Sequence, residues 1–362
     1  MRLDAITLEH FRNYAHQSVT FDPSVNVIVG ENAQGKTNLL ESVYLASVGR
    51  SARTPRWQEL IKWGEKEALV RVSVRKDIGR DEVTIKLDKE KRVAVNGLPL
   101  SRIGELMGVL KTVLFSPDEL RIVKDGPGER RRFIDIALCQ LSKAYFYALT
   151  RYNKILAQRN KLLKSSPADD AIDVWDMQLA REGARVVKTR RGFIERLAPL
   201  AEAVHLDITG SEKLSLSYEG PEGGSIDEIE AALLAALHKS RQRDRMFMLT
   251  HVGPQRDDLG ISVGDVDLRA YGSQGQQRSA ALSLKLAEME LLKAESGEYP
   301  VLLLDDVLSE LDEYRQSKLL SHIKAYQTII TCTSLSPEVR ERLGEAKEFR
   351  VSAGTVTEAD GA

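Results

Sequence analysis

Gly30-Glu31-Asn32-Ala33-Gln34-Gly35-Lys36-Thr37 is the stretch that decides the fold class of this chain. It follows an apolar run at 25–29 and precedes a run at 38–45 that is rich in apolar residues. A G-x-x-x-x-G-K-T pattern between a strand and a helix is typical of a phosphate-binding P-loop. Its glycines let several backbone N–H groups point inward at phosphate oxygens, and the helix that opens at Lys36 adds the positive end of its dipole. The stretch therefore predicts a nucleotide site.

The chemistry of a P-loop assigns roles to its last residues. We expect Lys36 to reach the β- and γ-phosphates and Thr37 to hold Mg²⁺. The predicted nucleotide-contacting residues of this loop are Gly30, Glu31, Asn32, Ala33, Gln34, Gly35, Lys36, Thr37 and Asn38.

Length and composition describe an ordinary globular protein. At roughly 150 residues per domain, 362 residues suggest two or three domains. The net charge is −1, so any nucleic-acid binding needs a local basic patch. The two cysteines, Cys139 and Cys332, have no zinc-ligand spacing and predict small core residues rather than a disulfide. No basic-then-apolar leader and no run of about 18 apolar residues is visible, so we expect a cytoplasmic protein without membrane association.

The order of the patterns predicts an α/β domain interrupted by helices. A loose strand pattern ends at residues 12–14, and alternating apolar residues at 68–74, 83–87 and 92–95 predict an antiparallel meander beside the main sheet. Helical spacing dominates 116–250, with one short alternating run at 214–218. The α/β pattern then resumes. We therefore predict a discontinuous domain at 1–115 and 251–362, with a helical arm inserted at 116–250.

A second chemical motif is Asp305-Asp306, at the end of the apolar strand 301–304. A continuous apolar run is typical of a strand buried on both faces of a parallel sheet. A carboxylate at the end of such a strand, beside a P-loop, is placed for Mg²⁺, which we assign to Asp305. Asp306 would then orient or deprotonate the attacking water, and with Lys36 it forms the predicted catalytic pair. The alternative is that the two aspartates cap the next helix.

A third motif is the loop Ser273-Gln274-Gly275-Gln276-Gln277, which leads into a helix. Its small residues, hydroxyl and amide groups and helix N-terminus could hold phosphate. Because the chain already has a P-loop, the simplest interpretation is that this loop serves the nucleotide of a second copy. An ordinary capped helix start would explain the same residues.

Together these motifs resemble the ABC-type ATPase head, and specifically the RecF family within the SMC-like group. Residues 30–37 match Walker A, 271–279 match the signature motif in its RecF form, and 302–312 match Walker B with the D-loop. The stretches 115–120, 126–135 and 250–258 also resemble RecF. The resemblance covers nearly the whole chain. It implies an α/β fold: an ABC-type P-loop ATPase head with a mixed sheet and an antiparallel side sheet, plus the inserted helical arm.

The resemblance implies an ATP-dependent homodimer that is a weak, Mg²⁺-dependent, DNA-stimulated ATPase. Each ATP would lie between the P-loop of one subunit and Ser273, Gly275 and Gln276 of the other, with Asp312 at the same interface. Arg12 and Asn13 resemble head residues that lie near the nucleotide. Family members bind duplex DNA near single-strand junctions and cooperate with RecR and RecO to load recombinase in gaps.

Three positions depart from the family pattern. ABC heads usually carry a glutamate where this chain has Asp306, whose shorter side chain is consistent with slow turnover. No histidine follows the strand 328–332, so Thr333 or Ser334 would have to substitute for the usual switch residue. No glutamine stands at 115–117, which leaves the Q-loop contact unassigned.

The densest basic clusters are the candidates for DNA contact, although each could equally be a solvated helix face. They are Arg130, Arg131 and Arg132, then Arg190 and Arg191, and then Arg241, Arg243 and Arg245. The short basic loop 50–53 is open between the same two interpretations. Without aromatic residues interleaved, we expect binding that is directed at the DNA backbone, independent of sequence and weakened by salt.

Two other functional classes fit parts of the sequence. One is the nucleotide-binding subunit of a transporter, against which the long interval between the P-loop and the signature motif argues. The other is a scaffold that binds ATP with negligible turnover, which the shorter Asp306 leaves open.

Overall fold

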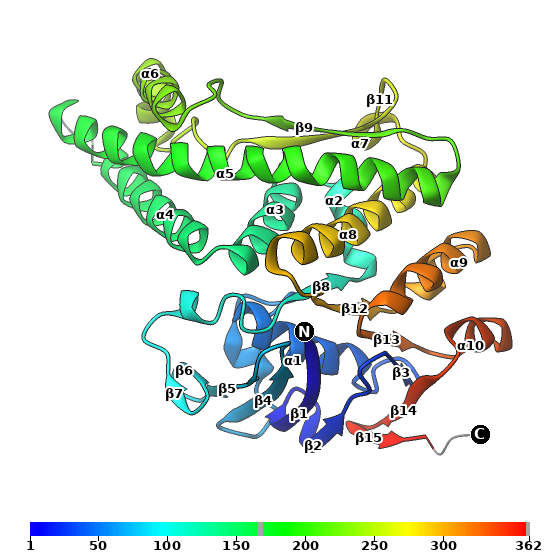
Figure 1. The fold of residues 1–362 in the computed structure, drawn as a ribbon. Coiled ribbons are helices and arrows are strands. Elements are labelled where there is room, and N and C mark those ends of the chain that lie inside the picture. Colours follow the sequence, from blue (N-terminus) through cyan, green and yellow to red (C-terminus); the bar gives the residue numbers. More distant parts are fainter. Residues whose placement is uncertain (166–168, 360–362) are drawn as a thin grey trace. The chain divides into compact units, whose positions relative to one another are not determined.

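The computed structural model describes residues 1–165 and 169–359, and the chain falls into two compact units (Figure 1). The first unit comprises Met1–Leu120, Val204–Gly210 and Arg278–Ala362. The second unit comprises Arg121–Ala203 and Ser211–Gln277.

A mostly parallel sheet forms the centre of the first unit. Its order is β15 (Thr355–Glu358), β14 (Ala346–Ser352), β3 (Val25–Val29), β13 (Thr328–Cys332), β12 (Val301–Asp305) and β8 (Thr112–Phe115). All neighbours pair in parallel except β15, which is antiparallel to β14. β13 is buried along its whole length and β12 up to Leu304, as their continuous apolar runs predict. The carboxyl ends of β3, β13 and β12 therefore meet at one edge, where polar residues follow.

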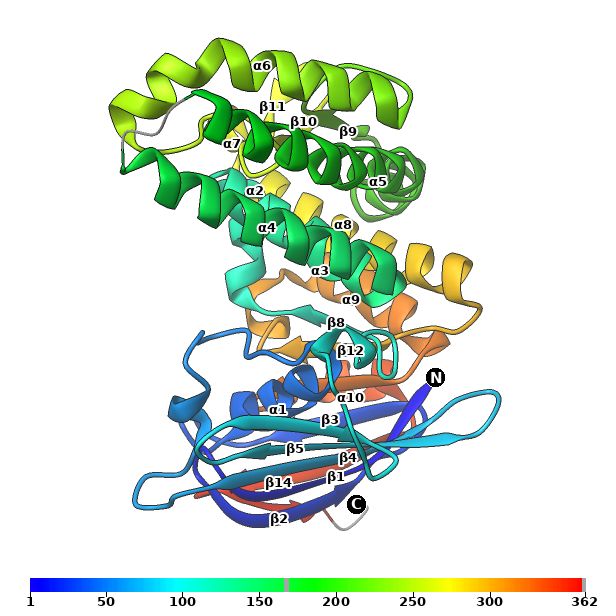
Figure 2. The same cartoon turned by 90° about the vertical axis from the view of Figure 1, so that its left-hand side faces the viewer.

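An antiparallel sheet completes the strands of the first unit. Its order is β2 (Tyr14–Thr20), β1 (Arg2–Phe11), β4 (Ala68–Arg75), β5 (Arg80–Leu87), β6 (Lys91–Val95) and β7 (Leu98–Pro99). In Figure 2 strands β1, β2, β4 and β5 run side by side. Alternate residues of β4 and β5 are buried, which is the meander that the sequence predicts. The sequence patterns missed β2 and β15, whose short edge strands carry few apolar residues.

Helix α1 (Lys36–Val48) packs against strands of both sheets, β4 and β5 of one and β12 and β13 of the other. Its residues from Leu39 to Val48 are all buried, so it is a core helix. Helix α8 (Gln274–Ser296) is buried at every position from Ser279 to Met289. The remaining short elements of the unit are α9 (Glu313–His322), α10 (Pro337–Leu343), and the 3₁₀ turns η1 (Trp57–Leu60), η2 (Ile103–Glu105), η3 (Pro117–Leu120), η4 (Leu308–Glu310) and η5 (Ile323–Ala325).

The second unit is mainly helical. Its helices are α2 (Arg121–Lys124), α3 (Pro127–Leu141), α4 (Lys143–Leu163), most of α5 (Asp169–Thr209), α6 (Ile226–Phe247) and α7 (Leu268–Tyr271). Strands β9 (Leu214–Glu219), β10 (Asp258–Val263) and β11 (Val266–Asp267) form a small antiparallel sheet. Helices α3 and α4 are separate, because Ser142 caps α4 by accepting a hydrogen bond from the Tyr145 N–H at 3.1 Å.

The bounds of the second unit differ from those predicted for the helical arm. Residues 251–277 pack with the second unit rather than with the mostly parallel sheet of the first unit. The reason is long-range: β10 pairs with β9 along its length, and Asp258 forms an ion pair with Arg130 of α3 at 2.6 Å. Within residues 1–165 and 169–359, no helix combines the length and apolar character needed to cross a membrane.

Candidate nucleotide-binding site

The backbone of the P-loop lies very close to neighbouring segments at its two glycines, Gly30 and Gly35. Gly35 has φ of +125°, and a Cβ atom there would lie 2.7 Å from Asn13 Nδ2. A Cβ on Gly30 would lie 2.4 Å from the Val351 carbonyl oxygen. No side chain caps the start of α1, whose first N–H groups therefore face the loop. Uncapped N–H groups behind a glycine turn fit the phosphates of a nucleotide.

Lys36 closes the same loop from the first turn of α1. Its Nζ donates hydrogen bonds to the carbonyl oxygens of Gly30 at 2.5 Å and Glu31 at 2.8 Å. The side chain is almost fully buried, whereas Glu31, Asn32 and Ala33 are exposed on the loop. Lys36 is therefore an ammonium held over the turn, where phosphate oxygens would compete for its protons.

Asp305 meets Thr37 across the site, although the two residues are far apart in the sequence. The Thr37 hydroxyl donates to Asp305 Oδ1 at 3.0 Å, and the Thr331 hydroxyl donates to the same atom at 2.7 Å. Burial raises the pKa of Asp305, an effect that hydrogen bonds from Thr331 and Thr37 oppose and the charge of Asp306 reinforces. A carboxylate and a hydroxyl oxygen at this spacing fit Mg²⁺, which prefers oxygen ligands.

Asp306 adopts a left-handed backbone, with φ of +53°. Its N–H donates to the Thr331 hydroxyl at 3.0 Å and to the Thr331 carbonyl at 3.2 Å. The side chain is half-buried. Neither Asp305 nor Asp306 caps a helix, because η4 has Val307 at its cap position and no side-chain cap. The helix-cap alternative is therefore wrong, and both carboxylates remain available at the carboxyl end of β12.

The turn between β1 and β2 supports the P-loop from one side. Asn13 Nδ2 donates to the Gln34 carbonyl at 2.8 Å, and its Oδ1 accepts from Asn38 Nδ2 at 2.8 Å. The Tyr14 hydroxyl donates to the Gly35 carbonyl at 2.9 Å, and burial raises the pKa of this phenol, which stays a neutral donor. Asn13 and Asn38, both predicted to contact nucleotide, thus lie against the loop.

Arg12 lies in the same turn, with φ of +54°, but its guanidinium is held by a carboxylate that sequence reasoning missed. Nε and Nη2 donate to the two carboxylate oxygens of Glu41, each at 2.8 Å. Glu41 is buried on α1 and also accepts from the Ser51 hydroxyl. This bidentate pair fixes the turn to the P-loop helix. No local pattern marks it, because Glu41 reads as an ordinary polar position of a helix.

The turn between β14 and β15 contacts the P-loop from another side. The Ala353 N–H donates to Gln34 Oε1 at 2.6 Å, and the Gly354 N–H donates to the Gln34 carbonyl at 3.1 Å. Gly354 has φ of +75°, and a Cβ there would lie 2.5 Å from the Asn13 carbonyl oxygen. Nothing in the sequence shows that the Ala353-Gly354 turn meets the P-loop.

The other predicted elements near the site are located as follows. Thr333 and Ser334, the candidate switch residues, are exposed just after β13. Cys332 is buried, as predicted, and burial raises the pKa of its thiol to about 11. Asp312 caps α9 by accepting from the Arg315 N–H at 2.9 Å.

The signature-like loop is a capped helix start in this chain. The Ser273 hydroxyl accepts from the Gln276 N–H at 3.2 Å, and Gln276 Oε1 accepts from the Ser273 N–H at 3.1 Å. This is a capping box. Ser273 is exposed and belongs with Gly275 and Gln276 to the second unit, whereas the P-loop belongs to the first. Their predicted meeting across a dimer stays a prediction.

Two of the eight arginines named as candidates for DNA contact are interior residues. Arg130 binds the carboxylate of Asp258 at 2.6 and 2.8 Å, and Arg190 binds that of Asp135 at 2.9 Å through two of its nitrogens. Both residues are 2% exposed. Each therefore neutralises a carboxylate inside the second unit and offers nothing to a phosphate, so these two assignments are corrected.

The neighbours of these arginines are less enclosed. Arg131 is half-buried and donates to the Asp257 carbonyl at 2.7 Å. Arg191 donates to the carbonyls of Gly223 and Pro221. Arg132 is half-exposed, with Glu129 at 3.8 Å. Arg132 is thus the member of the first triplet with the most accessible guanidinium, and its contact with DNA stays a prediction.

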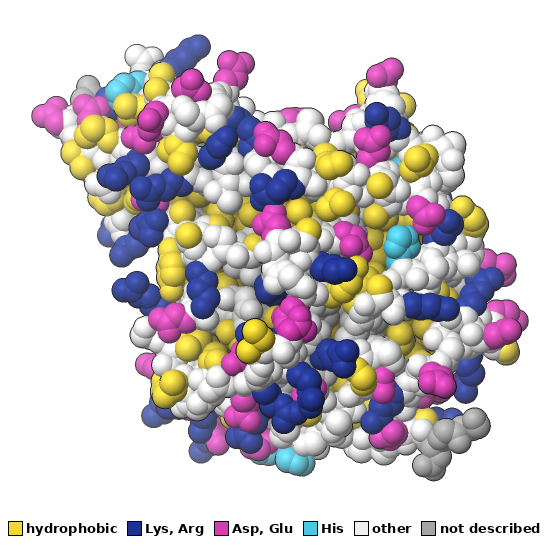
Figure 3. Space-filling view, viewed as in Figure 1, with side chains coloured by type: hydrophobic (Ala, Val, Ile, Leu, Met, Phe, Trp, Pro, Cys, Tyr) yellow, Lys and Arg dark blue, Asp and Glu magenta, His cyan; other side chains and the backbone are white. Residues whose placement is uncertain are grey.

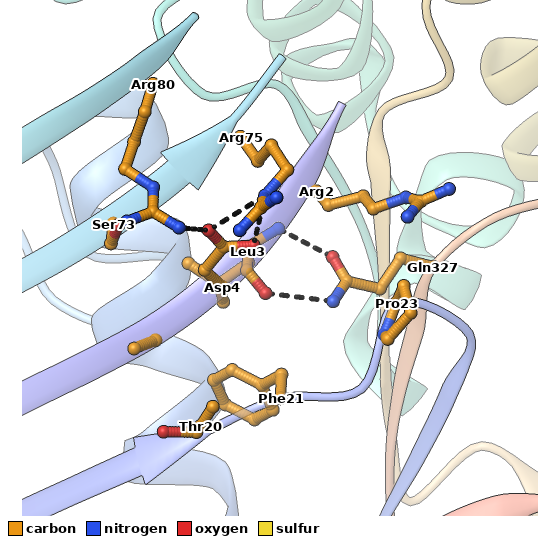
Figure 4. A pocket seen from close by; sticks show the side chains of 11 residues that line it. Arg2, Leu3, Asp4, Thr20, Phe21, Pro23, Ser73, Arg75, Arg80 and Gln327 are labelled. Atoms are coloured by element: carbon orange, nitrogen blue, oxygen red, sulfur yellow. Dashed lines mark hydrogen bonds and ion pairs between the residues drawn. The ribbon is translucent and has the colours of Figure 1, made fainter. Parts of the chain in front are cut away.

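A hollow of about 470 Å³ lies at the opposite end of the sheets (Figure 4). It is lined in part by Arg75 and Arg80, which both donate to Asp4, and by Gln327, which precedes β13. Because the P-loop contacts the other end of β13, this hollow is separate from the nucleotide site. Arg75 and Arg80 are already paired with Asp4, which indicates a structural role for these three charges.

The fold and site define a class of protein, the ABC-type P-loop ATPase head. A family model described as RecF/RecN/SMC N terminal domain matches residues 2–355. The DNA replication and repair protein RecF of Agathobacter rectalis is 47% identical over 98% of this chain and 99% of its own length. That of Alkaliphilus oremlandii is 46% identical over 98% and 100%. The chain therefore belongs to the RecF family.

Solved structures agree with this assignment. The structure of the recombination mediator protein RecF-ATPrS in the RecFOR pathway has a TM-score of 0.93 at 38% identity, covering 99% of this chain and 98% of that one. The RecF-ATP structure has a TM-score of 0.92 at 38% identity over 99% and 97%. An Smc head bound to the C-winged helix domain of ScpA, at TM-score 0.59 and 16% identity over 99% and 97%, supports the fold alone.

Proposed function

We propose that this chain is a cytoplasmic, Mg²⁺-dependent ATPase that binds duplex DNA near gaps or junctions. ATP brings two copies together around the DNA, and slow, DNA-stimulated hydrolysis releases it. The observation that carries the proposal is the convergence of the P-loop, Thr37 and Asp305, with Thr37 Oγ1 and Asp305 Oδ1 at 3.0 Å. Thr37 and Asp305 are far apart in the sequence, and their side chains meet directly beside the P-loop.

The residues of the site divide the work of hydrolysis. Lys36 and the N–H groups of the P-loop hold the phosphates and stabilise the charge that develops on them. Thr37 and Asp305 would hold Mg²⁺, which would supply further neutralisation of that charge when bound. Asp306 orients the attacking water and accepts its proton. Arg12 and Asn13 contact the nucleotide from beside the P-loop. Glu41 holds Arg12 in place, and the Gln34 carbonyl holds Asn13.

In the proposed mechanism, ATP binding and dimerisation are thermodynamically linked. A ligand stabilises a two-subunit state only through its extra affinity for that state. In the proposal, the γ-phosphate provides that affinity by contacting Ser273, Gly275 and Gln276 of the second copy, with Asp312 nearby. A ligand present at about 100 times its dissociation constant adds roughly 2.7 kcal/mol to the state that it prefers. Hydrolysis removes this contribution, so ATP and ADP should differ in the dimer affinity that they support.

The wider role is proposed from the relatives. The similar proteins are DNA replication and repair proteins, and the solved RecF structures belong to the RecFOR pathway. We accordingly propose RecR and RecO as partners and the loading of recombinase at gaps as the outcome. The ATP-bound neighbours support ATP as the nucleotide.

The test is ATP hydrolysis measured against protein concentration, with and without duplex DNA. A specific rate that rises with concentration, and again with DNA, is expected because the site is shared between two subunits. A rate that is flat and insensitive to DNA would contradict the dimer and the role of Ser273.

Asp306→Asn is the companion variant, and it should lower the rate by about 10²-fold or more with ATP binding retained. A residual rate that this variant does not change would instead favour an ATP-binding scaffold. Association of the expressed chain with membranes would favour the transporter alternative.

A further inference from the structure

Trp63 is an exposed aromatic residue for which the fold gives no packing reason. Its side chain is 95% exposed, although an indole usually buries most of its surface. It lies in the turn after η1, between Lys62 and Gly64, and the Gly64 φ of +87° allows the chain to reverse there. The turn therefore presents the indole to solvent with both ring faces accessible.

This turn is fixed beside the β1–β2 turn. The Arg12 N–H donates to the Leu60 carbonyl at 2.7 Å, and the Lys62 N–H donates to the His10 carbonyl at 2.7 Å. Lys62 Nζ also donates to the Asn13 carbonyl at 2.9 Å. Two backbone hydrogen bonds and one from the Lys62 side chain thus hold the segment on the N-terminal side of Trp63 against residues 10–13.

The same β1–β2 turn touches the P-loop. Asn13 binds the Gln34 carbonyl and Asn38, and the Arg12 guanidinium binds Glu41 of α1. A nucleotide whose phosphates lie between Lys36 and Thr37 must extend its base past one of the segments that flank the loop. The β14–β15 turn on another side presents only Ala353 and Gly354, whose N–H groups are engaged with Gln34. The turn at 60–64 offers an aromatic surface.

We propose that Trp63 stacks on the adenine ring of the ATP held by the P-loop. The inference rests on the proposed ATP binding and names the residue that recognises the base. An indole face makes no hydrogen bonds, so stacking should favour any purine base over a ligand without a base. Trp63 is then a positioning residue for the nucleotide, not a catalytic one.

The experiment compares ATP with tripolyphosphate, which has the phosphates but no base. Both are titrated with Mg²⁺ into the full chain by calorimetry, for the wild type, Trp63→Ala and Trp63→Phe. Trp63→Ala should weaken ATP binding about tenfold and leave tripolyphosphate binding unchanged. Trp63→Phe should retain most of the ATP affinity, because a phenyl ring still stacks. Ile78→Ala is the matched control, since Ile78 is 94% exposed in the β4–β5 turn of the same unit.

The outcomes separate this inference from the function on which it rests. Equal ATP affinity in the wild type and Trp63→Ala would overturn the stacking role and leave the ATPase proposal intact. Equal losses of affinity for ATP and tripolyphosphate would overturn it too, because Trp63 would then affect phosphate binding by the P-loop rather than contact with the base. A wild-type chain that binds neither ligand would overturn both proposals. Unchanged ATP affinity with loss of the concentration dependence of hydrolysis would assign Trp63 to the contact with a second copy instead.

Discussion

At the scale of single residues, Gly35 is the position of the P-loop that tolerates least change. Its φ of +125° disfavours any side chain, and a Cβ would meet Asn13 and Tyr14 at 2.7 to 3.0 Å. Gly35→Ala should therefore abolish measurable ATP binding in calorimetry, since the P-loop must move away from the β1–β2 turn. Gly79→Ala is the control, because Gly79 has φ of +88° with open space and should lose only ~1 kcal/mol of stability. Normal ATP affinity in Gly35→Ala would contradict this reading of the loop.

Asp305 gives a prediction about pH at the same scale. Its pKa is raised in the folded state, chiefly by burial, so the folded chain binds this proton more tightly than the unfolded chain does. The contribution of Asp305 to the free energy of unfolding therefore falls as pH rises from the ordinary value of 3.8 through the raised pKa, and stays lower at neutral pH. Removal of the charge should stabilise the protein at pH 7 in the absence of Mg²⁺ and nucleotide.

The measurement is the melting temperature of Asp305→Asn. We expect an increase at neutral pH, which shrinks as the pH falls toward 3.8. Asparagine keeps an oxygen that can accept from Thr37 and Thr331, so those hydrogen bonds survive. Mg²⁺ with ATP should raise the melting temperature of the wild type but not that of the variant. A variant that melts lower at pH 7 would show that the carboxylate charge is stabilising.

At the scale of elements, two glutamines join the sheets of the first unit. Gln327, just before β13, accepts from the Leu3 N–H at 2.7 Å and donates to the carbonyls of Leu3 at 2.9 Å and Asp22 at 2.7 Å. Gln17 of β2 similarly binds the N–H and carbonyl of Val356 in β15, at 2.8 and 3.0 Å. The nucleotide site uses strands of both sheets, so these links help to hold its halves together.

The two links should differ in strength. Gln327 is buried, so Gln327→Ala leaves Leu3 with an unpaired backbone N–H and carbonyl in the interior, at a cost of about 2–3 kcal/mol. Gln17 is only half-buried, and water can replace it, so Gln17→Ala should cost less than about 1 kcal/mol. Urea unfolding of the two variants tests this difference. Equal losses would mean that burial does not decide the strength of the link.

Elements were predictable where the signal was local. The run at 301–304 and the glycine pattern at 30–37 each carry their meaning within a few residues, and β12 and the P-loop lie where expected. The supports of the site are not local. Arg12 meets Glu41, and Gln34 meets Gly354, only because sheet pairing brings distant segments together. A buried glutamate on a helix and an exposed one look alike in the sequence.

At the scale of the whole molecule, charge was the hardest property to read. The triplet Arg130 to Arg132 looks uniformly basic in sequence, but each residue of a helix turns by about 100°, so Arg130 faces Asp258 inside while Arg132 reaches outward. On the face drawn in Figure 3, Lys and Arg side chains are interspersed with Asp and Glu. Some arginines that look available for DNA contact in the sequence are thus already neutralised by carboxylates within the fold.

The salt dependence of DNA binding follows from this distribution. With a net charge of −1, the protein has no overall field to hold DNA, and affinity must come from local contacts with phosphates. Each phosphate neutralised lowers the slope of log affinity against log salt by about 0.9. Duplex binding, measured with ATP present between about 50 and 200 mM salt, should therefore fall steeply and linearly on this plot.

Arg132→Ala should make that slope shallower by about 0.9, the contribution of one phosphate contact. Arg151→Ala, which removes an exposed arginine paired with Glu182 in the same unit, should leave it unchanged. Unlike Arg130→Ala, neither change removes a buried guanidinium, so both variants should keep the fold. A shared slope in all three proteins would place the DNA contact elsewhere on the chain. An affinity that hardly responds to salt would mean that backbone phosphates are not what this protein recognises.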